Sequence, residues 1–316
     1  MVHLLRRRLV PCLATLLATS AILAQQPRTA TVPTPDVTLT TFTYGAPSSA
    51  TPVIAVNGGP GLSHVYMIQN NVWTVRIPAH RQVIMYDQRG TGASPLTNPA
   101  APQTMDAQVA DLEAVRASLH VGKVHFLGDS YGGLLVSAYA AAHPEHVLTL
   151  TLSDSAAPGF AALHPRLHEA FPDVIAATKE KIAKLSGPDK AAKAADLDLD
   201  AHMRMIFYSP ELADRYLNNA PPGLGNAPAA GEAVSKAIEK LDLTPQMAEF
   251  RFPVLVLQGR YDLNVTPDVS WTVAHNIPGA QLVFFEHSGH LPYYEEPEKY
   301  AQVVEQFLEA HDPSGH

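Results

Sequence analysis

The chain has 316 residues, of which 46% are hydrophobic and 16% are charged, and its formal net charge is −8 at pH 7. This composition is that of a globular protein with a large core, and it excludes an intrinsically disordered chain. The acidic balance argues against nucleic acid or an anionic membrane surface as a partner.

The first 24 residues are typical of a secretory signal peptide. Arg6, Arg7 and Arg8 precede an apolar run, residues 9–24, which is followed by two glutamines. A basic start, a short apolar stretch and a small residue at its end describe such a leader. We therefore expect cleavage after Ala24 and a secreted or periplasmic protein. A retained membrane anchor is the alternative, although the run is short of the ~20 residues that span a bilayer.

The single cysteine, Cys12, lies within this leader. We therefore expect the exported protein to have no disulfide, no cysteine nucleophile and no thiolate metal site. Removing the leader takes away three arginines and no acidic residue, so the formal net charge changes from −8 to −11. We expect no metal, no cofactor and no stable membrane association after the leader is removed.

Short apolar segments and helical patterns alternate in the first half of the chain. Residues 27–35 are rich in threonine and proline and indicate an extended linker. Strands are predicted at residues 36–44, 52–56, 82–86, 123–127 and 147–152, and the clearest helix is predicted at residues 105–119. Apolar strands that alternate with helices predict a mostly parallel sheet covered on both faces.

The pattern changes between residues 158 and 250, which are rich in alanine, lysine and aspartate and contain no strong strand. Strands and helices then resume, at residues 253–257, 280–285 and 297–310. We therefore predict an α/β core formed by residues 25–157 and 251–316. A helical cap or lid, residues 158–250, is inserted into it after the sixth strand.

Ser130 lies in the sequence GDSYG, residues 128–132, between a predicted buried strand and a predicted buried helix. A G-x-S-x-G pattern in this context is typical of a nucleophile elbow, a strained turn that holds a serine hydroxyl above the sheet. The two glycines allow the backbones to approach closely. So short a pattern also occurs by chance, but its context indicates that Ser130 is a nucleophile.

A serine nucleophile needs a base that takes its proton and an acid that orients the base. In this architecture they follow in the order Ser, Asp or Glu, then His. Asp262 and His290 each follow a predicted strand, so we expect both at the carboxyl edge of the sheet. His287 is the alternative base and Asp154 the alternative acid.

The oxyanion that forms during acyl transfer needs preorganised N–H donors. We expect one donor to be the amide of Tyr131, directly after the nucleophile. The second is expected to be the amide of Gly59, in the loop NGGPG at residues 57–61. A plain tight turn is the alternative interpretation of this loop.

These motifs together resemble the proline iminopeptidase family of α/β-hydrolases, which includes the tricorn-interacting aminopeptidases. The resemblance covers nearly all of residues 50–157 and 251–300. It rests on the sequences NGGPGLSH, YDQRGTGAS, GDSYGG, GRYD and HSGH, which begin at residues 57, 86, 128, 259 and 287. One departure is Asn57, because the glycine loop of the family usually opens with histidine. The resemblance also implies that Asp87 and Arg89 are structural and pin loops near the site.

The family implies release of an N-terminal residue, often proline, from short peptides. Such specificity requires acidic groups that hold the free ammonium of the substrate. In relatives these acids come mainly from the cap, where Glu232 is the candidate and Glu211 and Glu249 are alternatives. A solvated surface position is the competing interpretation of Glu232. Leu263 stands where some relatives carry a second glutamate.

The leading hypothesis is a secreted aminopeptidase that acts on small peptides through an acyl-enzyme. An esterase, lactonase or amidase that acts on small neutral substrates is the second, and Asn57 and Leu263 favour it. A non-catalytic binding module is the third, but that function normally follows the loss of a triad member, and none is missing. The sequence leaves the oligomeric state open.

Overall fold

The computed structural model describes residues 26–225 and 227–313, so the predicted leader, residues 1–24, lies entirely outside the described residues. Eight strands form one sheet in the order β1-β2-β4-β3-β5-β6-β7-β8. β2 is antiparallel to both of its neighbours, and all the other neighbouring strands are parallel. The strands are β1 (Arg28–Pro33), β2 (Thr38–Tyr44), β3 (Val53–Val56), β4 (Val83–Tyr86), β5 (Val124–Asp129), β6 (Val147–Ser153), β7 (Val254–Gly259) and β8 (Gln281–Phe285).

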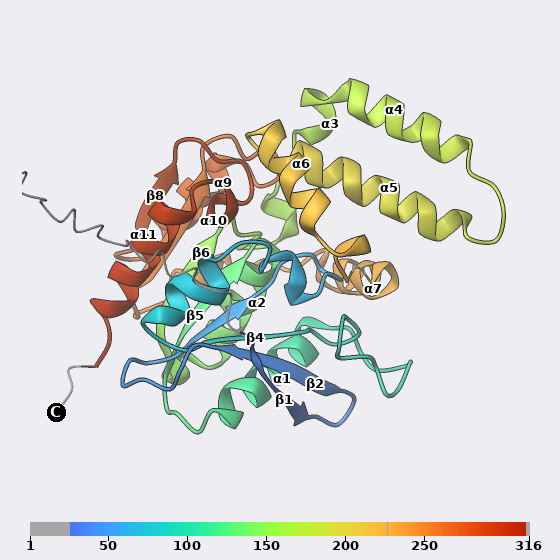
Figure 1. The fold of residues 1–316 in the computed structure, drawn as a ribbon. Coiled ribbons are helices and arrows are strands. Elements are labelled where there is room, and N and C mark those ends of the chain that lie inside the picture. The colour runs from blue at the N-terminus through green and yellow to red at the C-terminus, as the bar shows by residue number, and fades with distance from the viewer. Residues whose placement is uncertain (1–25, 226, 314–316) are drawn as a thin grey trace, which may run out of the picture.

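Helices cover the sheet and fill the interval between β6 and β7 (Figure 1). The α-helices are α1 (Met105–Ser118), α2 (Tyr131–Ala142), α3 (Leu167–Ala170), α4 (Pro172–Ala183), α5 (Lys190–Met205), α6 (Pro210–Asn219), α7 (Pro228–Ile238), α8 (Thr244–Met247), α9 (Pro267–Asn276), α10 (Pro292–Glu295) and α11 (Pro297–Glu309). Short 3-10 or π turns are η1 (His64–Tyr66), η2 (Val72–Arg76), η3 (Ile77–Ala79), η4 (Pro144–His146), η5 (Phe160–Ala162) and η6 (Pro222–Gly225). No helix of the described part of the chain is long and apolar enough to cross a membrane.

The two faces of the sheet bury two separate hydrophobic clusters. Side chains alternate across a strand, so Ile54 and Val56 of β3 pack with α1, α2 and α9, whereas Val53 and Ala55 pack with η2 and α11. This arrangement is the predicted α/β-hydrolase fold, with a mostly parallel sheet and helices on both faces.

The first strand departs from the prediction of an extended linker at residues 27–35. β1 pairs with β2 along its whole length, from Arg28 opposite Thr43 to Pro33 opposite Thr38. All of its side chains except Val32 are exposed, so its sequence carries no apolar alternation that could reveal a strand. Its place at the edge of the sheet also explains why proline is tolerated at its end.

The inserted helices α3 to α8 divide between the two clusters. Met203 of α5 and Tyr216 of α6 pack into the cluster that contains η2 and α11. Val234 of α7 and Met247 of α8 pack into the cluster that contains α1 and α2. Figure 1 shows α4 and α5, in yellow-green, extending away from the sheet. The insertion is therefore anchored to the core on both sides.

A buried hydrogen-bond cluster and a buried ion pair hold the loop after β4 against the rest of the core. Asp87 accepts hydrogen bonds from the backbone and ring of His64 and from the Ala93 amide. The Arg89 guanidinium binds both oxygens of Asp111 on α1, at 2.7 and 2.8 Å. Both residues therefore have the structural contacts that the sequence resemblance implies.

Replacing Arg89 with methionine is expected to lower the free energy of unfolding by about 3 kcal/mol, because Asp111 is then left buried without its charge partner. Urea unfolding measures the change. The matched control is Arg204→Met, because Arg204 is 43% exposed and pairs with Asp200 and Asp214 at the surface. The control is expected to cost at most about 1 kcal/mol. Equal losses in the two variants would contradict a structural role for the buried pair.

Candidate active site

Ser130 sits in a sharp turn between β5 and α2. Its φ is 53° and its ψ is −120°, a conformation that residues other than glycine rarely adopt. A Cβ on Gly128 would lie 2.3 Å from the Gly132 carbonyl oxygen, and a Cβ on Gly132 would lie 2.2 Å from the Val56 carbonyl oxygen. Only glycine fits at these two positions, so the sequence around Ser130 forms the strained elbow that it predicts.

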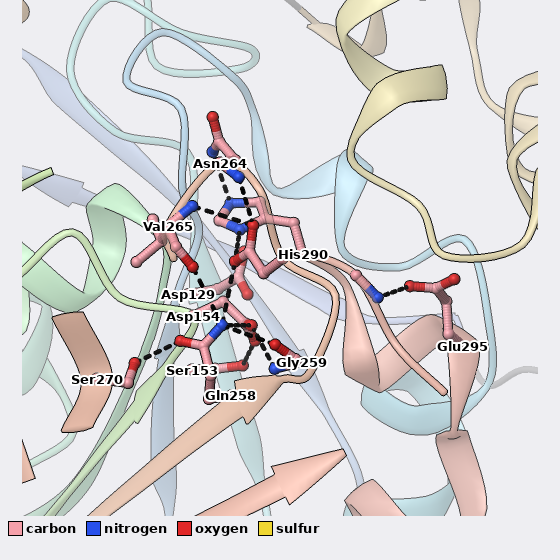
Figure 2. A network of polar contacts seen from close by, with 12 residues as sticks. Asp129, Ser153, Asp154, Gln258, Gly259, Asn264, Val265, Ser270, His290 and Glu295 are labelled. Carbon is pink, nitrogen blue, oxygen red and sulfur yellow. Dashed lines mark hydrogen bonds and ion pairs between the residues drawn. The ribbon is translucent and has the colours of Figure 1, made fainter. Parts of the chain in front are cut away.

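Asp262 and His290 meet at the carboxyl edge of the sheet. Asp262 follows β7 and His290 follows β8, and His290 Nδ1 lies 2.6 Å from Asp262 Oδ2. The other carboxylate oxygen of Asp262 accepts hydrogen bonds from the amides of Asn264 and Val265, at 2.7 and 3.0 Å. These bonds fix the carboxylate, which in turn orients the imidazole. Figure 2 shows this network around His290.

The alternative base and acid lie elsewhere. His287 is exposed at the surface, and its amide binds Glu296. Asp154 is fully buried, but its Oδ1 accepts hydrogen bonds from the Gly259 amide and the Gln258 side chain. Burial raises the pKa of Asp154 well above its usual value, and the charge of Asp262 raises it further. Both effects favour the protonated carboxyl of Asp154.

The ligand-type atoms of Asp154, Asp262 and His290 lie within 4.8 Å of one another, in the one such group among the described residues. These atoms bind one another, backbone amides and the side chains of Gln258 and Asn264. We assign no metal role to this group.

A cavity of about 60 Å³ joins the serine to the histidine. Its lining residues are Gly59, Leu62, Tyr66, Ser130, Leu199, His202, Met203, Ile206, Asn264, His290 and Leu291. Four of them come from α5 and its end, so the cap forms one wall. Asp and Glu are absent from this lining. A larger groove, of about 640 Å³, is lined by the C-terminal turn of α2, the start of β6 and the residues before β7. This groove shares no lining residue with the cavity at Ser130 and His290.

The loop at residues 57–61 lies beside the elbow. Gly59 lines the cavity with Ser130, and Tyr131 begins α2 directly after the serine. The side chain of Asn57 donates hydrogen bonds to the carbonyls of Gly58 and Leu62, at 3.0 and 2.9 Å. The asparagine that stands in place of the family histidine therefore braces this loop from within.

Three residues near the site carry contacts that the sequence did not reveal. Asn264 Nδ2 lies 3.2 Å from His290 Nε2, the nitrogen that faces away from Asp262. Asp129 and Tyr66 are buried and contact each other. Asp129 belongs to the elbow sequence and Tyr66 lies nine residues after Asn57, but a pattern of residue types does not show which side chains meet.

The cap and the histidine loop are joined by hydrogen bonds. The His290 amide donates to the Ile206 carbonyl at 2.7 Å. Glu295 accepts from the amides of Tyr208 and Ser209 in the cap and of Gly289 in the loop, at 2.8, 3.0 and 2.7 Å. Burial raises the pKa of Glu295 to about 7, against the lowering effect of these amides. The position of His290 therefore depends on the cap.

The structure does not bring Glu232 into the cavity. Glu232 is exposed on α7, where it lines a shallow groove with Phe160, Ala161, Ser235, Lys236 and Glu239. Its neighbour Gly231 packs against Pro60, so α7 borders the oxyanion loop although the carboxylate faces solvent. The alternatives are also surface groups, since Glu211 binds Ser209 and Glu249 pairs with Arg251.

Comparisons with known proteins show the family to which the chain belongs. The model of the α/β-hydrolase fold family matches residues 51–297. A proline iminopeptidase from Lactobacillus delbrueckii subsp. bulgaricus is 31% identical over 279 residues, which are 85% of this chain and 93% of that protein. The chain therefore belongs to the α/β-hydrolase fold family, and within it to the proline iminopeptidase family.

Solved structures show the same fold. An esterase from Thermogutta terrifontis is similar with a TM-score of 0.67 and 24% identity, over 92% of this chain and 100% of that one. The proline iminopeptidase of Mycobacterium smegmatis is similar with a TM-score of 0.65 and 23% identity, over 90% of this chain and 98% of that one. Peptidases and esterases share this scaffold, so the fold alone does not set the substrate.

The imidazole of His290 is expected to titrate above its usual pKa of 6.5. Burial lowers the pKa of His290, but the charge of Asp262 and its hydrogen bond outweigh burial and raise it. Asp262→Asn removes that charge, so the midpoint is expected to fall. Nuclear magnetic resonance of labelled histidine rings measures the midpoint, and the signal lost in His290→Gln assigns it.

The matched control for this titration is Asp154→Asn, which changes a buried neighbouring carboxyl that makes no hydrogen bond to His290 and whose neutral form burial favours. It is expected to leave the midpoint unchanged. An unchanged midpoint in Asp262→Asn would show that Asp262 does not set the charge of the imidazole.

Proposed function

We propose that this hydrolase is a serine aminopeptidase that releases small N-terminal residues from short peptides through an acyl-enzyme. One observation carries the proposal: Ser130, on a strained elbow, shares a cavity with a histidine whose Nδ1 binds a buried aspartate at 2.6 Å. The order of the three residues along the chain and the contact between His290 and Asp262 support a Ser-Asp-His triad.

In this mechanism Ser130 Oγ attacks the carbonyl carbon of the scissile bond and its proton passes to Nε2 of His290. Asp262 holds the imidazole and stabilises the cation that forms. The amides of Gly59 and Tyr131 bind the oxyanion. Collapse of the intermediate expels the amine, which takes the proton from His290. A water molecule then hydrolyses the acyl-enzyme by the same steps.

The choice of a peptide substrate is supported by the curated relatives, which are named proline iminopeptidases. The cavity supports a small acyl group. Its volume of about 60 Å³ is far below the ~300 Å³ at which small-molecule pockets usually begin. Leu62, Leu199 and Met203 make its wall apolar, which suits a compact ring such as that of proline.

An esterase that acts on small neutral substrates is the second candidate, and one observation favours it. A free ammonium that enters an apolar site needs an acidic partner, and no carboxylate lines this cavity. The two positions at which the family resemblance implies such an acid do not supply a carboxylate here, because residue 263 is leucine and Glu232 faces solvent.

A panel of substrates decides between the two. Proline p-nitroanilide, its N-acetylated form and p-nitrophenyl acetate are compared by kcat/KM. The aminopeptidase proposal predicts a fall of about ten- to a hundredfold on acetylation, because a charge-assisted hydrogen bond of about 1.5–3 kcal/mol is lost. Equal rates on the free and acetylated anilides would end that proposal and support the esterase.

Two variants control this panel. Ser130→Ala is expected to lower kcat on the order of 10⁶-fold for whichever substrate is turned over. Glu232→Gln is expected to leave all three rates unchanged, because its carboxylate lies in a solvent-facing groove outside the cavity. A loss in Glu232→Gln that is confined to the free anilide would show that α7 turns this acid toward the substrate.

We also infer from residues 1–24 that the protein is exported. N-terminal sequencing of protein recovered from outside the cytoplasm is expected to begin at Gln25. An exported protein that retains Met1, or activity found only in the cytoplasm, would contradict this inference.

A further inference from the structure

Hydrogen bonds join the nucleophile elbow to the oxyanion loop through one tyrosine. The hydroxyl of Tyr66, in η1, contacts Oδ2 of Asp129 and accepts a hydrogen bond from the Gly58 amide at 2.9 Å. Asp129 is the last residue of β5 and directly precedes Ser130. The phenol therefore connects the nucleophile elbow to the loop at residues 57–61 and fixes their relative position.

Tyr66 also lines the cavity in which the proposed oxyanion would form. Gly59, Ser130 and His290 line the same cavity. A Cβ added to Gly58 would lie 2.7 Å from Tyr66 Oη and 2.8 Å from the Cβ of Ser130. The phenol oxygen and the nucleophile are therefore neighbours around one small space.

The hydrogen-bonding capacity of the phenol makes its direction depend on Asp129. A tyrosine hydroxyl has one proton to donate and two lone pairs that accept, and the Gly58 amide takes one lone pair. An ionised Asp129 can only accept, so the phenol proton must point toward it. A protonated Asp129 can donate to the second lone pair, which frees the phenol proton for the cavity.

The surroundings of Asp129 favour the protonated carboxyl. Its side chain is fully buried, and Oδ1 has no hydrogen-bond partner within the described part of the chain. A carboxylate charge in such surroundings is costly. Burial raises the pKa of Asp129 to about 7, although the charge of His290 and the hydrogen bond from Tyr66 lower it.

We propose that Tyr66 is a third oxyanion donor beside the amides of Gly59 and Tyr131, and that the protonated carboxyl of Asp129 directs its hydroxyl toward the oxyanion. This inference rests on the proposed acyl transfer at Ser130. Tyr66 is a catalytic residue in this account, and Asp129 is a positioning residue that acts through it.

The chemical step needs no proton transfer from the phenol of Tyr66. The bond between Ser130 Oγ and the carbonyl carbon forms while the π electrons move onto the carbonyl oxygen. The serine proton passes to His290. Tyr66 keeps its proton and shares it with the oxyanion in a hydrogen bond, and the bond is lost when the oxyanion collapses.

Other titratable groups also face Asp129 from the elements packed around it. They are Tyr66, Asp154, Tyr216, Asp262, His290, Tyr293 and Tyr300. Burial raises the pKa of each of these tyrosines well above the usual value, so the tyrosines stay neutral near pH 7. Burial and the charge of Asp262 also raise the pKa of Asp154. The charge of Asp262 raises the pKa of Asp129 and that of His290 lowers it.

Two opposite pH dependences follow. Activity rises as His290 loses its proton, because only the neutral imidazole accepts the serine proton. Activity then falls as Asp129 loses its proton, because the phenol turns toward the carboxylate. His290 and Asp129 interact electrostatically, so the two apparent pKa values of the profile describe the coupled pair and not either residue alone. We expect a bell-shaped profile of kcat with an alkaline limb close to pH 7.

The first test is Tyr66→Phe, assayed with p-nitrophenyl acetate. Removal of one oxyanion donor is expected to lower kcat about 10²-fold or more while KM changes by less than about threefold. The matched control is Tyr293→Phe, a buried tyrosine that faces Asp129 and whose hydroxyl has no hydrogen-bond partner among the described residues. It is expected to keep the kcat of the parent protein.

The second test is Asp129→Asn, whose amide cannot ionise. The alkaline limb of kcat is expected to disappear in this variant, and the acid limb set by His290 is expected to remain. A purely structural role for Asp129 would change the level of activity but leave both limbs in place. Circular dichroism checks that each variant is folded.

Two outcomes would overturn the inference: a Tyr66→Phe variant that keeps the parent kcat, or an alkaline limb that persists in Asp129→Asn. The proposed acyl transfer is tested separately by Ser130→Ala. If Ser130→Ala keeps its activity, the proposed function fails. If Ser130→Ala is inactive and Tyr66→Phe is unaffected, only the third donor is wrong.

Discussion

The tight turn between β5 and α2 is the constraint on which the site depends. Ser130 adopts a positive φ there, and the carbonyl oxygens beside Gly128 and Gly132 leave no space for a Cβ. The turn sets the direction of the serine hydroxyl, the position of the Tyr131 amide and the burial of Asp129 at the same time. In the proposed mechanism this strain has a role, because a relaxed turn would displace the proposed nucleophile and a proposed oxyanion donor together.

The proposed base, His290, is positioned from two directions. Asp262 holds Nδ1 of His290 from the core, and the backbone of His290 is bonded to Ile206 in the cap. Glu295 adds three further bonds between the cap and the histidine loop. In the proposed mechanism, the inserted helices therefore help to position His290 and also form one wall of the cavity.

The sequence predicted the features that depend on order along the chain, and it missed those that depend on tertiary contact. The elbow, Asp262 and His290 were predictable because parallel strands bring their carboxyl ends to one edge. β1 was missed because its exposed side chains lack apolar alternation. The contact between Tyr66 and Asp129 joins residues 63 positions apart, and no local pattern announces it. For Glu232 the residue type was predictable, but the direction of its side chain, which faces solvent, was not.

The covalent step at Ser130 is the central claim, and peptide mapping tests it most directly. The protein is treated with a fluorophosphonate, digested and analysed by tandem mass spectrometry. The account predicts one phosphonyl group, on Ser130, and no label after His290→Gln, because the hydroxyl then has no base. A label on another residue, or labelling of Ser130 at an unchanged rate in His290→Gln, would contradict the account.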